Sequence, residues 1–401
     1  MLQITDPEKE QKTLPLLRLG FRPFFLFGSV FSVVAMILWL FMLKGSLSLS
    51  PLGGMQWWHI HEMTFGFGCA ITVGFLLTAV QTWTGIKGVQ GTPLLLLFIL
   101  WMLGRVFVLF PHILGGSLSS IIDISFLPIS AYMLGKPIIA IKQYRNLFFV
   151  PLLLLFTLAN ITMHLSLSYP ETFSYQLSSY TGIILIVLLM SVISGRVVPM
   201  FTANGTKTPK ADPSPVLDKL TNIPLALAMF MLLLHPLITF NTLVFGSLLT
   251  FSGIFQTLRW LKWKPYRTLN VPLVWALHSG LMFISFGLIL LGLSYILIEL
   301  PSNHIWHLIT IGGIGGLIIA MITRVSLGHT GRPLIAPKTI PLAYFLIIVA
   351  TIIRVFAPWI WPESTVIFID ISGFLWILSF TLFIYHYMPI LLSARADNKS
   401  G

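Results

Sequence analysis

The stretch PFFLFGSVFSVVAMILWLFML, Pro23 to Leu43, contains no charged residue and is long enough to cross a lipid bilayer as an α-helix. Its apolar residues follow one another without the alternation expected of a membrane-spanning strand. Because lipid offers no water to hydrogen-bond the backbone, a spanning segment of this kind must be helical. The rest of the chain is similarly apolar, since 56% of its 401 residues are hydrophobic. We therefore predict an all-α, polytopic membrane protein.

Twelve such segments follow one another along the chain when hydropathy is averaged over about 19 residues. They predict a single twelve-helix membrane domain over residues 22–393, between an N-terminal segment, 1–21, and a tail, 394–401. The N-terminal segment is charged and has no apolar core before a small-residue cleavage site, so we expect no removable signal peptide. The predicted spans are 22–43, 59–83, 93–112, 118–134, 147–167, 177–200, 223–238, 243–261, 272–298, 304–325, 340–356 and 366–392.

The positive charges predict the orientation of these spans. If both termini are cytoplasmic, only Lys44 falls in an external loop, and only Arg105 and Arg354 fall in spans away from their cytoplasmic ends. The other 21 of the 24 Lys and Arg residues then lie in cytoplasmic loops or at the cytoplasmic ends of spans, as the positive-inside rule requires. This bias also accounts for the net charge of +12 in a protein of the lipid bilayer, with no nucleic-acid partner.

A weak internal repeat accompanies the spans. The second, sixth and tenth spans end in TWTG, TANG and GHTG, at Gly85, Gly205 and Gly331, which are 120 and 126 residues apart. The spacing suggests three units, or arcs, of four helices each. The alternative is that each glycine is an ordinary helix C-cap.

Two histidine pairs open spans on the predicted external side: HIH at His59 and His61, and HIWH at His304 and His307. Helical residues two apart point about 200° apart, so His59 and His61 diverge unless the first lies in an unwound turn. Residues three apart share a face, as do His59 with Glu62 and His304 with His307. We expect His59 or His61, Glu62 and His307 to converge if the second and tenth spans pack together.

Two arginines and two aspartates fall within spans, toward the same external half. They stand in LGRVF, IIDISFLP, IIRVF and FIDISGF, at Arg105, Asp123, Arg354 and Asp370. An uncompensated charge there costs several kcal/mol, so each should be paired or bound to a ligand. Either the arginines hold the carboxylates of a buried anionic cofactor, or they pair with the aspartates. The GGIGG run of the tenth span likewise permits close approach of a planar ring or of a neighbouring helix.

A second polar group lies near the predicted cytoplasmic side. Arg324, His329 and Arg332 stand in RVSLGHTGRPL, and His278 lies inside the ninth span. The group is either a basic turn that meets lipid phosphates or a second cofactor or proton-entry site. Neutral imidazole binds iron and copper, and haem iron takes histidine axially, so the histidines favour a metal or haem site. The chain has no C-x-x-C-H motif for c-type haem and no nucleotide-binding P-loop.

Five motifs spread from the first span to the tenth resemble those of the NnrS family. The resemblance implies a bacterial inner-membrane protein of about twelve helices that contains haem and copper and acts in nitric oxide metabolism and nitrosative stress. It also implies an architecture similar to the catalytic subunits of haem and copper oxidases. The motifs are LGFRPFFLFG (19–28), WHIHEMTFGFG (58–68), GFLLTAVQTWTG (74–85), GRVVPMFTANG (195–205) and MITRVSLGHTGRPL (321–334).

We therefore predict a membrane haem and copper protein that binds or turns over nitric oxide in the external, periplasmic half of the bilayer. One alternative is a secondary transporter of a metal complex, of haem or of an anion derived from nitric oxide. Another is a nitric oxide reductase with a quinol donor. The predicted metal ligands are His59, His61, His307, His278 and His329; the predicted cofactor partners are Arg105, Arg354, Arg324 and Arg332; and Glu62 is the predicted proton relay.

Overall fold

The computed structural model describes residues 13–297 and 300–397. The first twelve residues of the predicted N-terminal segment, the predicted end of the ninth span at 298, and the last four residues of the tail lie outside this part. Within it the chain forms twelve long helical segments and no strand, which confirms the prediction of an all-α fold.

The contacts between residues divide the chain into two compact units. Unit 1 takes in the described residues of 1–182, with 325–334 and 383–401, and unit 2 takes in those of 183–324 and 335–382. The predicted single domain and three four-helix arcs therefore stay predictions. The first helices of unit 1 are η1 (Pro15–Leu17), α2 (Phe21–Leu43), α3 (Gly54–His61), η2 (Glu62–Gly68), α4 (Cys69–Thr84), α5 (Thr92–Leu109), α6 (Gly116–Ala140), η3 (Tyr144–Asn146) and α7 (Phe149–Leu165).

The remaining elements belong mainly to unit 2. Helix α8 begins in unit 1, and α13 and α15 end there. These elements are α8 (Tyr175–Thr206), α9 (Pro215–Leu233), α10 (Thr242–Lys262), η4 (Pro265–Arg267), α11 (Pro272–Ile296), α12 (Ser302–His307), η5 (Leu308–Gly315), α13 (Gly316–His329), α14 (Ile340–Ile360), η6 (Pro362–Ser364) and α15 (Thr365–Leu392).

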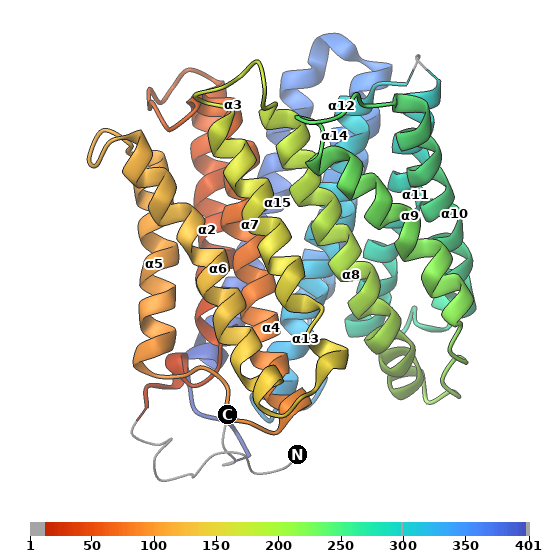
Figure 1. Ribbon diagram of the computed structural model, residues 1–401. Coiled ribbons are helices and arrows are strands. Elements are labelled where there is room, and N and C mark those ends of the chain that lie inside the picture. Colours follow the sequence, from red (N-terminus) through yellow and green to blue (C-terminus); the bar gives the residue numbers. More distant parts are fainter. Residues whose placement is uncertain (1–12, 298–299, 398–401) are drawn as a thin grey trace. The chain divides into compact units, whose positions relative to one another are not determined.

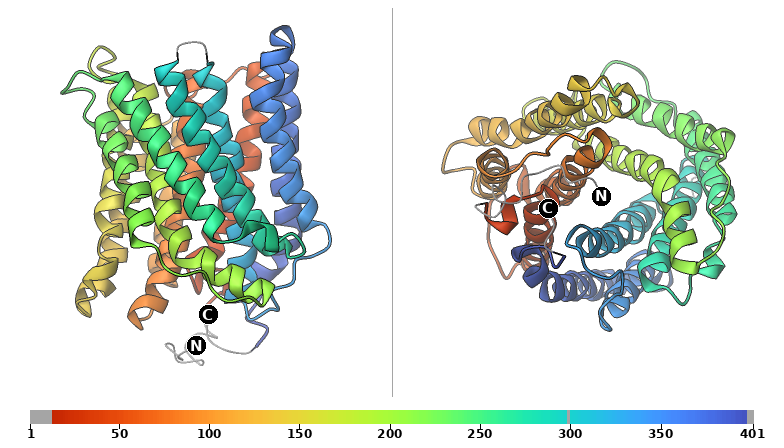
Figure 2. Two further views of the ribbon diagram at one scale, coloured as in Figure 1. Left: turned by 90° about the vertical axis from the view of Figure 1, so that its right-hand side faces the viewer. Right: turned by 90° about the horizontal axis from the view of Figure 1, so that it is seen from below.

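Eleven of the twelve segments are long and apolar enough to cross a membrane. The exception is α10, which forms a helix where a span was predicted but carries Gln256, Arg259 and Lys262 in its second half. Helices α9, α10 and α11 lie side by side as green to teal ribbons in Figure 2. Between α10 and α11, a Cβ added to Gly253 would lie 2.8 Å from the Ser285 carbonyl oxygen, so glycine allows this close packing.

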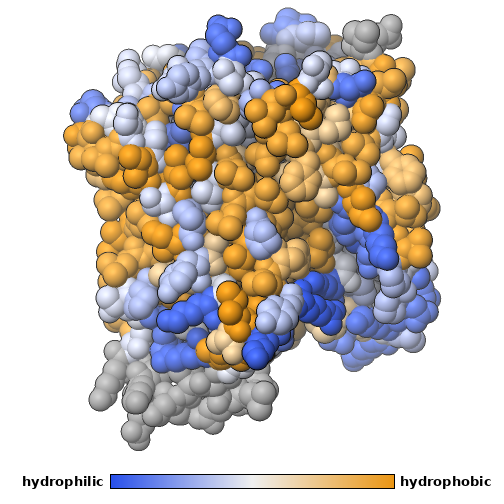
Figure 3. All heavy atoms as spheres, in the orientation of Figure 1, coloured by the Kyte–Doolittle hydropathy of each residue, from blue (hydrophilic) through white to orange (hydrophobic). Residues whose placement is uncertain are grey.

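Helix α5 shows how a span divides between core and lipid. Helix α5 lies beside α6 (Figure 1), and Leu97, Trp101 and Arg105 recur every four residues on its buried face. Trp101 and Arg105 contact η2, at the Gly66 carbonyl oxygen and at Glu62. On the other face Leu96 and Ile99 keep 60% and 41% of their surface exposed. In Figure 3 hydrophobic residues cover much of the visible middle of the helices, and hydrophilic residues gather toward the ends. Such apolar exposure suits lipid rather than water.

Two spans contain a π-helical segment, which corrects the assumption of unbroken α-helix there. Segment η2 begins directly after His61, and η5 begins directly after His307. Both are rich in glycine, which lets the backbone come close to neighbouring side chains. A π-helix pairs residues five apart rather than four, and single π-turns are frequent at functional sites. Side-chain directions after each histidine therefore depart from the α-helical spacing used for the sequence.

The glycine run of the tenth span packs against other helices. A Cβ on Gly312 would lie 2.6 Å from the Phe283 ring, and one on Gly315 would lie 2.5 Å from the Trp376 ring. The sequence predicted that this run approaches either a planar ring or a neighbouring helix, and Gly312 and Gly315 pack against neighbouring helices.

Candidate metal centre

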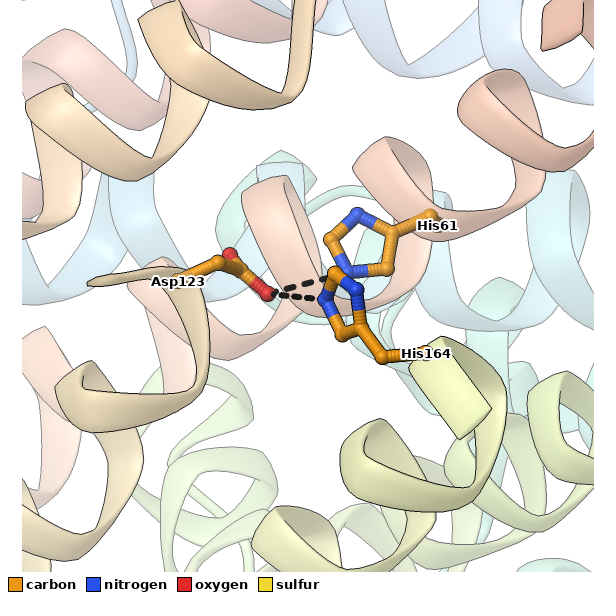
Figure 4. Close-up of side chains that lie close together, drawn as sticks. All are labelled: His61, Asp123 and His164. Carbon is orange, nitrogen blue, oxygen red and sulfur yellow. Dashed lines mark hydrogen bonds and ion pairs between the residues drawn. The ribbon is translucent and has the colours of Figure 1, made fainter. Parts of the chain in front are cut away.

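Five ionisable side chains are buried together where α3, α5, α6 and α7 meet in unit 1. His61 ends α3 and Glu62 begins η2, while Arg105, Asp123 and His164 lie on α5, α6 and α7. His61 and Glu62 have no exposed surface, and none of the other three exposes more than 6%. Figure 4 shows His61 and His164 approaching the same carboxylate oxygen of Asp123. The site thus combines residues from four separate parts of the sequence: the His61–Glu62 pair, and one residue from each of α5, α6 and α7.

Asp123 is the centre of the group. Its Oδ2 lies 3.1 Å from His61 Nε2 and 2.9 Å from His164 Nε2. The same oxygen accepts a hydrogen bond of 2.8 Å from Asn160 Nδ2. Its other oxygen, Oδ1, accepts a hydrogen bond from Arg105 Nη2. Both carboxylate oxygens are therefore satisfied without water, as a buried charge requires.

Arg105 bridges two carboxylates. Its Nη1 donates to Glu62 Oε2 at 2.6 Å, and its Nη2 donates to Asp123. The guanidinium carbon also lies 5.9 Å from the centre of the Phe31 ring. This arrangement is the paired alternative predicted for the buried charges, and the role of Arg105 as a partner of cofactor carboxylates stays a prediction.

Both ring nitrogens of His61 face hydrogen-bond acceptors. Nδ1 lies 3.0 Å from Glu62 Oε1, and Nε2 lies 2.9 Å from Asn160 Oδ1 as well as beside Asp123. The ring stacks on Trp57, with centroids 4.6 Å apart and planes at 9°. A neutral imidazole has one N–H and would leave one side of this arrangement without a positive partner. A second proton on the His61 ring, or a metal ion bound at the unprotonated nitrogen, supplies a positive partner for the acceptors on that side.

The formal charges of the group also require one additional positive charge. With Glu62 and Asp123 ionised, Arg105 charged and both histidines neutral, the formal sum is −2 + 1 = −1. A net charge buried among membrane helices is costly unless it is compensated. One added positive charge makes the group neutral.

The donor atoms suit a transition metal. The ligand atoms of His61, Asp123 and His164 all lie within 4.8 Å of one another. Metal–ligand bonds of about 2.1 Å place donors up to about 4.2 Å apart, so little movement is needed to surround an ion. Two imidazoles and a carboxylate are a set that iron, copper and zinc accept. Among the described residues, the buried Nδ1 of His164 has no hydrogen-bond partner, so this ring is not fixed at both ends by structural bonds.

The sequence prediction named His61 and Glu62 but missed His164 and Asn160 as parts of this site. The two missed residues are four apart on α7 and therefore lie on one face of that helix. This spacing is the signal that was present in the sequence. His59, the other candidate at this position, stacks on Trp39 at 4.2 Å instead, so the two histidines do diverge as predicted.

The predicted histidines of unit 2 occupy defined positions. His307 Nδ1 lies 3.0 Å from the Asn303 carbonyl oxygen, and His304 Nδ1 lies 2.8 Å from Arg354 Nη1. His278 Nε2 lies 2.8 Å from the hydroxyl of Thr202. The metal-binding roles of His278 and His307, and the expected convergence of His307 with the first histidine pair, stay predictions.

Two of the residues predicted near the cytoplasmic side, His329 and Arg332, form hydrogen bonds with the C-terminal residues Arg395 and Ser393. The carbonyl oxygen of His329 accepts a 2.9 Å hydrogen bond from Arg395, and Arg332 donates to the Ser393 hydroxyl at 3.1 Å. In unit 2 the Arg324 guanidinium lies 4.1 Å from the centre of the Phe201 ring. Their predicted cofactor roles are not tested by these contacts.

The sequence model of the NnrS protein family matches residues 15–395, nearly the whole chain. The chain belongs to the NnrS family. This match confirms the resemblance drawn from the five motifs, and the buried His61–Asp123–His164 group is thus a feature of an NnrS protein. A search of curated proteins gives no match.

Proposed function

We propose that this NnrS protein is a haem and copper protein of the bacterial inner membrane, with both termini cytoplasmic, that binds or turns over nitric oxide. The single observation that carries the proposal is the buried group of His61, Asp123 and His164 with its formal charge of −1. Membership of the NnrS family supports the link to nitric oxide. The orientation rests on the predicted positive-inside bias.

Copper is the metal ion that we propose this group binds. Its two imidazoles are ligands that copper accepts readily, and a singly charged copper ion would bring the formal charge of the group to zero. A bound copper ion would supply a redox-active centre at which nitric oxide binds. The surrounding residues keep bulk water away, because Trp57 covers one face of the His61 ring and every member of the group is buried.

Glu62 holds and orients the first imidazole. Its Oε1 accepts from His61 Nδ1, which leaves His61 Nε2 directed at the Asp123 side of the group. A carboxylate behind a metal-binding histidine fixes the ring and raises its basicity. The same oxygen is also where a proton shared with His61 would be held, which supports the predicted relay role of Glu62.

The test is metal analysis and absorption spectroscopy of the purified full-length protein. Copper is expected in the wild type, and the His61→Ala, Asp123→Asn and His164→Ala variants are expected to lower copper occupancy at least about tenfold. His112→Ala is the matched control, because His112 is exposed and outside the group. A wild-type preparation that contains neither copper nor haem overturns the proposal.

A secondary transporter is the second candidate, and the two interrupted spans favour it. Transporters bind their substrates where membrane helices are broken near the middle of the bilayer. Segments η2 and η5 are irregular turns of this general kind, each beside a histidine. Movement of a copper complex into proteoliposomes, without nitric oxide binding, would favour this candidate over the first.

A further inference from the structure

Three motifs of the second, third and fourth spans recur in the same order in the tenth, eleventh and twelfth. The pattern H-x-x-T-x-G begins at His61 and again at His307. The tripeptide RVF follows at Arg105 and at Arg354, and the tetrapeptide IDIS then surrounds Asp123 and Asp370. The three charged or metal-binding residues of the first set thus each have a counterpart in the second.

The backbone repeats along with the motifs. His61 and His307 each end a short α-helix and are each followed by a π-helical segment. A left-handed glycine then closes each span 24 residues after its histidine, Gly85 with φ 68° and Gly331 with φ 71°. One glycine C-cap is commonplace, but the whole sequence of α-turn, π-turn, α-helix and left-handed glycine is not.

The neighbours of the repeated elements correspond as well. A Cβ on Gly66 would lie 3.0 Å from Phe31 of α2, in the first span, and 2.5 Å from Arg105 of α5, in the third. At the equivalent position of the pattern, a Cβ on Gly312 would lie 2.6 Å from Phe283 of α11 and 2.8 Å from Thr351 of α14. Those helices are the ninth and eleventh spans. The first four spans and the last four are therefore two copies of one four-helix arrangement.

The two copies differ in charge. The position of Glu62 is taken by Leu308 in the second copy, and His164 and Asn160 lie on the fifth span, outside the repeated four. Arg354 and Asp370 alone sum to zero, whereas the first group sums to −1. A bare metal ion would leave the second copy with an uncompensated positive charge in the membrane. A metal whose own ligand is a dianion, such as ferrous iron in a porphyrin ring, would add no charge, and any carboxylates on that ligand would need donors such as Arg354.

The side chains of the second copy offer what such a ligand needs. The Asn303 carbonyl can only accept, so His307 Nδ1 carries a proton, and the lone pair of the neutral ring lies on Nε2. A backbone carbonyl behind one ring nitrogen is the usual arrangement of a metal-binding histidine. The Arg354 guanidinium can only donate, so His304 Nδ1 accepts and its ring proton lies on Nε2. Arginine and this N–H are donors for the carboxylates of a ligand.

We infer that the second copy is a separate ligand site, in which His307 binds the metal of a ligand carrying its own negative charge and Arg354 holds that ligand's carboxylates. Haem is a ligand of this class, so the inference rests on the proposed function and deepens it. The first copy takes the bare copper ion, and the second takes the haem. His304 orients Arg354 through its Nδ1, and its Nε2–H is a second donor for the same carboxylates.

The test measures both cofactors in the same purified full-length samples, haem by its Soret band and pyridine haemochrome, and copper by mass spectrometry. His307→Ala and Arg354→Met are expected to lower haem at least about tenfold and to leave copper unchanged. His61→Ala and Asp123→Asn are expected to do the reverse. His112→Ala, the exposed control, should leave both cofactors at the wild-type ratio.

The outcomes separate this inference from the proposed function. A wild type without haem and copper refutes the proposed function itself. A wild type with both, in which the second-copy variants keep their haem or lose both cofactors equally, refutes only the assignment to the second copy. If His307→Ala does not fold, His307→Met keeps an axial ligand, and a shifted Soret band is expected. An unchanged band in that variant overturns the inference.

Discussion

Replacing Arg105 with methionine removes the cation that two buried carboxylates share. Arg105 is 5% exposed, and it donates to Glu62 Oε2 at 2.6 Å and to Asp123 Oδ1. Each charge-assisted hydrogen bond contributes about 1.5–3 kcal/mol net, so the two together predict a loss of about 3–6 kcal/mol. Removal of one partner from a buried ion pair typically costs about 3–5 kcal/mol, which agrees. We therefore expect the free energy of unfolding to fall by about 4 kcal/mol.

A double-mutant cycle with Glu62→Gln tests the cause of this loss. The double variant, Glu62→Gln with Arg105→Met, has one buried carboxylate fewer to compensate, so it should regain about 1–3 kcal/mol over the sum of the single changes. Unfolding is followed by tryptophan fluorescence in detergent, on metal-free protein so that copper loss does not contribute. A cost below about 1 kcal/mol for Arg105→Met, as for exposed ion pairs, would refute the reasoning. Strict additivity of the two changes would refute it equally.

Three further changes probe the surroundings of this group and a second buried arginine. Gly66→Ala places a Cβ 2.5 Å from Arg105 Nη1 and should cost about 1–3 kcal/mol of unfolding free energy in the same assay. Trp57→Ala removes the ring stacked on His61, so we expect a loss of about 3–5 kcal/mol and a lower copper content by mass spectrometry. Arg259→Met in α10 removes the donor shared by Asp218, Ser191 and Gln256. Because the Asp218 side chain is 47% exposed and water can replace its partner, we expect a loss of about 1–3 kcal/mol in thermal or detergent unfolding, mainly from the buried Ser191 and Gln256, and unchanged unfolding would contradict this structural role.

The twelve helices were predictable because each depends mainly on its own composition. An apolar run such as the one in α2 cannot leave its backbone unpaired in lipid, whatever its neighbours are. The exception among the spans, α10, shows the limit of this argument. Arg259 is buried and donates to the Ser191 carbonyl oxygen of α8 and to Asp218 of α9, and Gln256 accepts from the Ser191 hydroxyl. Hydropathy alone does not show which face of a helix meets a partner.

The π-helical segments were not predictable from periodicity. The change from pairing residues four apart to five apart alters one turn and leaves the composition of the span the same. Glycines at Gly66 and Gly68 were visible, but glycine equally marks helix packing. The π-helical turns of η2 determine which side chains after His61 lie on the same helix face as His61. The geometry of the site beyond that residue could therefore be known only from the structure.

The charged residues of the candidate site were predictable, because a buried charge requires a partner. Its neutral residues were not, because their contacts depend on how the helices pack. An arginine and an aspartate inside lipid must be compensated, so a pairing of Arg105 with Asp123 was one of the two alternatives predicted for the buried charges. Neutral residues carry no such constraint. Asn160 joins the group only because α7 turns that face toward α6, and no property of its own segment requires it.

The two proposed ligand sites differ because the two copies of the four-helix arrangement differ in charge. Both copies keep an arginine, an aspartate and a histidine, whose charges balance without any ligand when the imidazole is neutral. What the first copy adds is Glu62, and with it a net negative charge that is compensated only by a cation. What the second copy keeps is neutrality, with Leu308 in place of the carboxylate. Because a membrane interior penalises net charge far more than water does, this difference favours a bare cation in the first copy, while in the second copy Arg354 contacts the neutral His304 and can pair with the carboxylates of the proposed ligand.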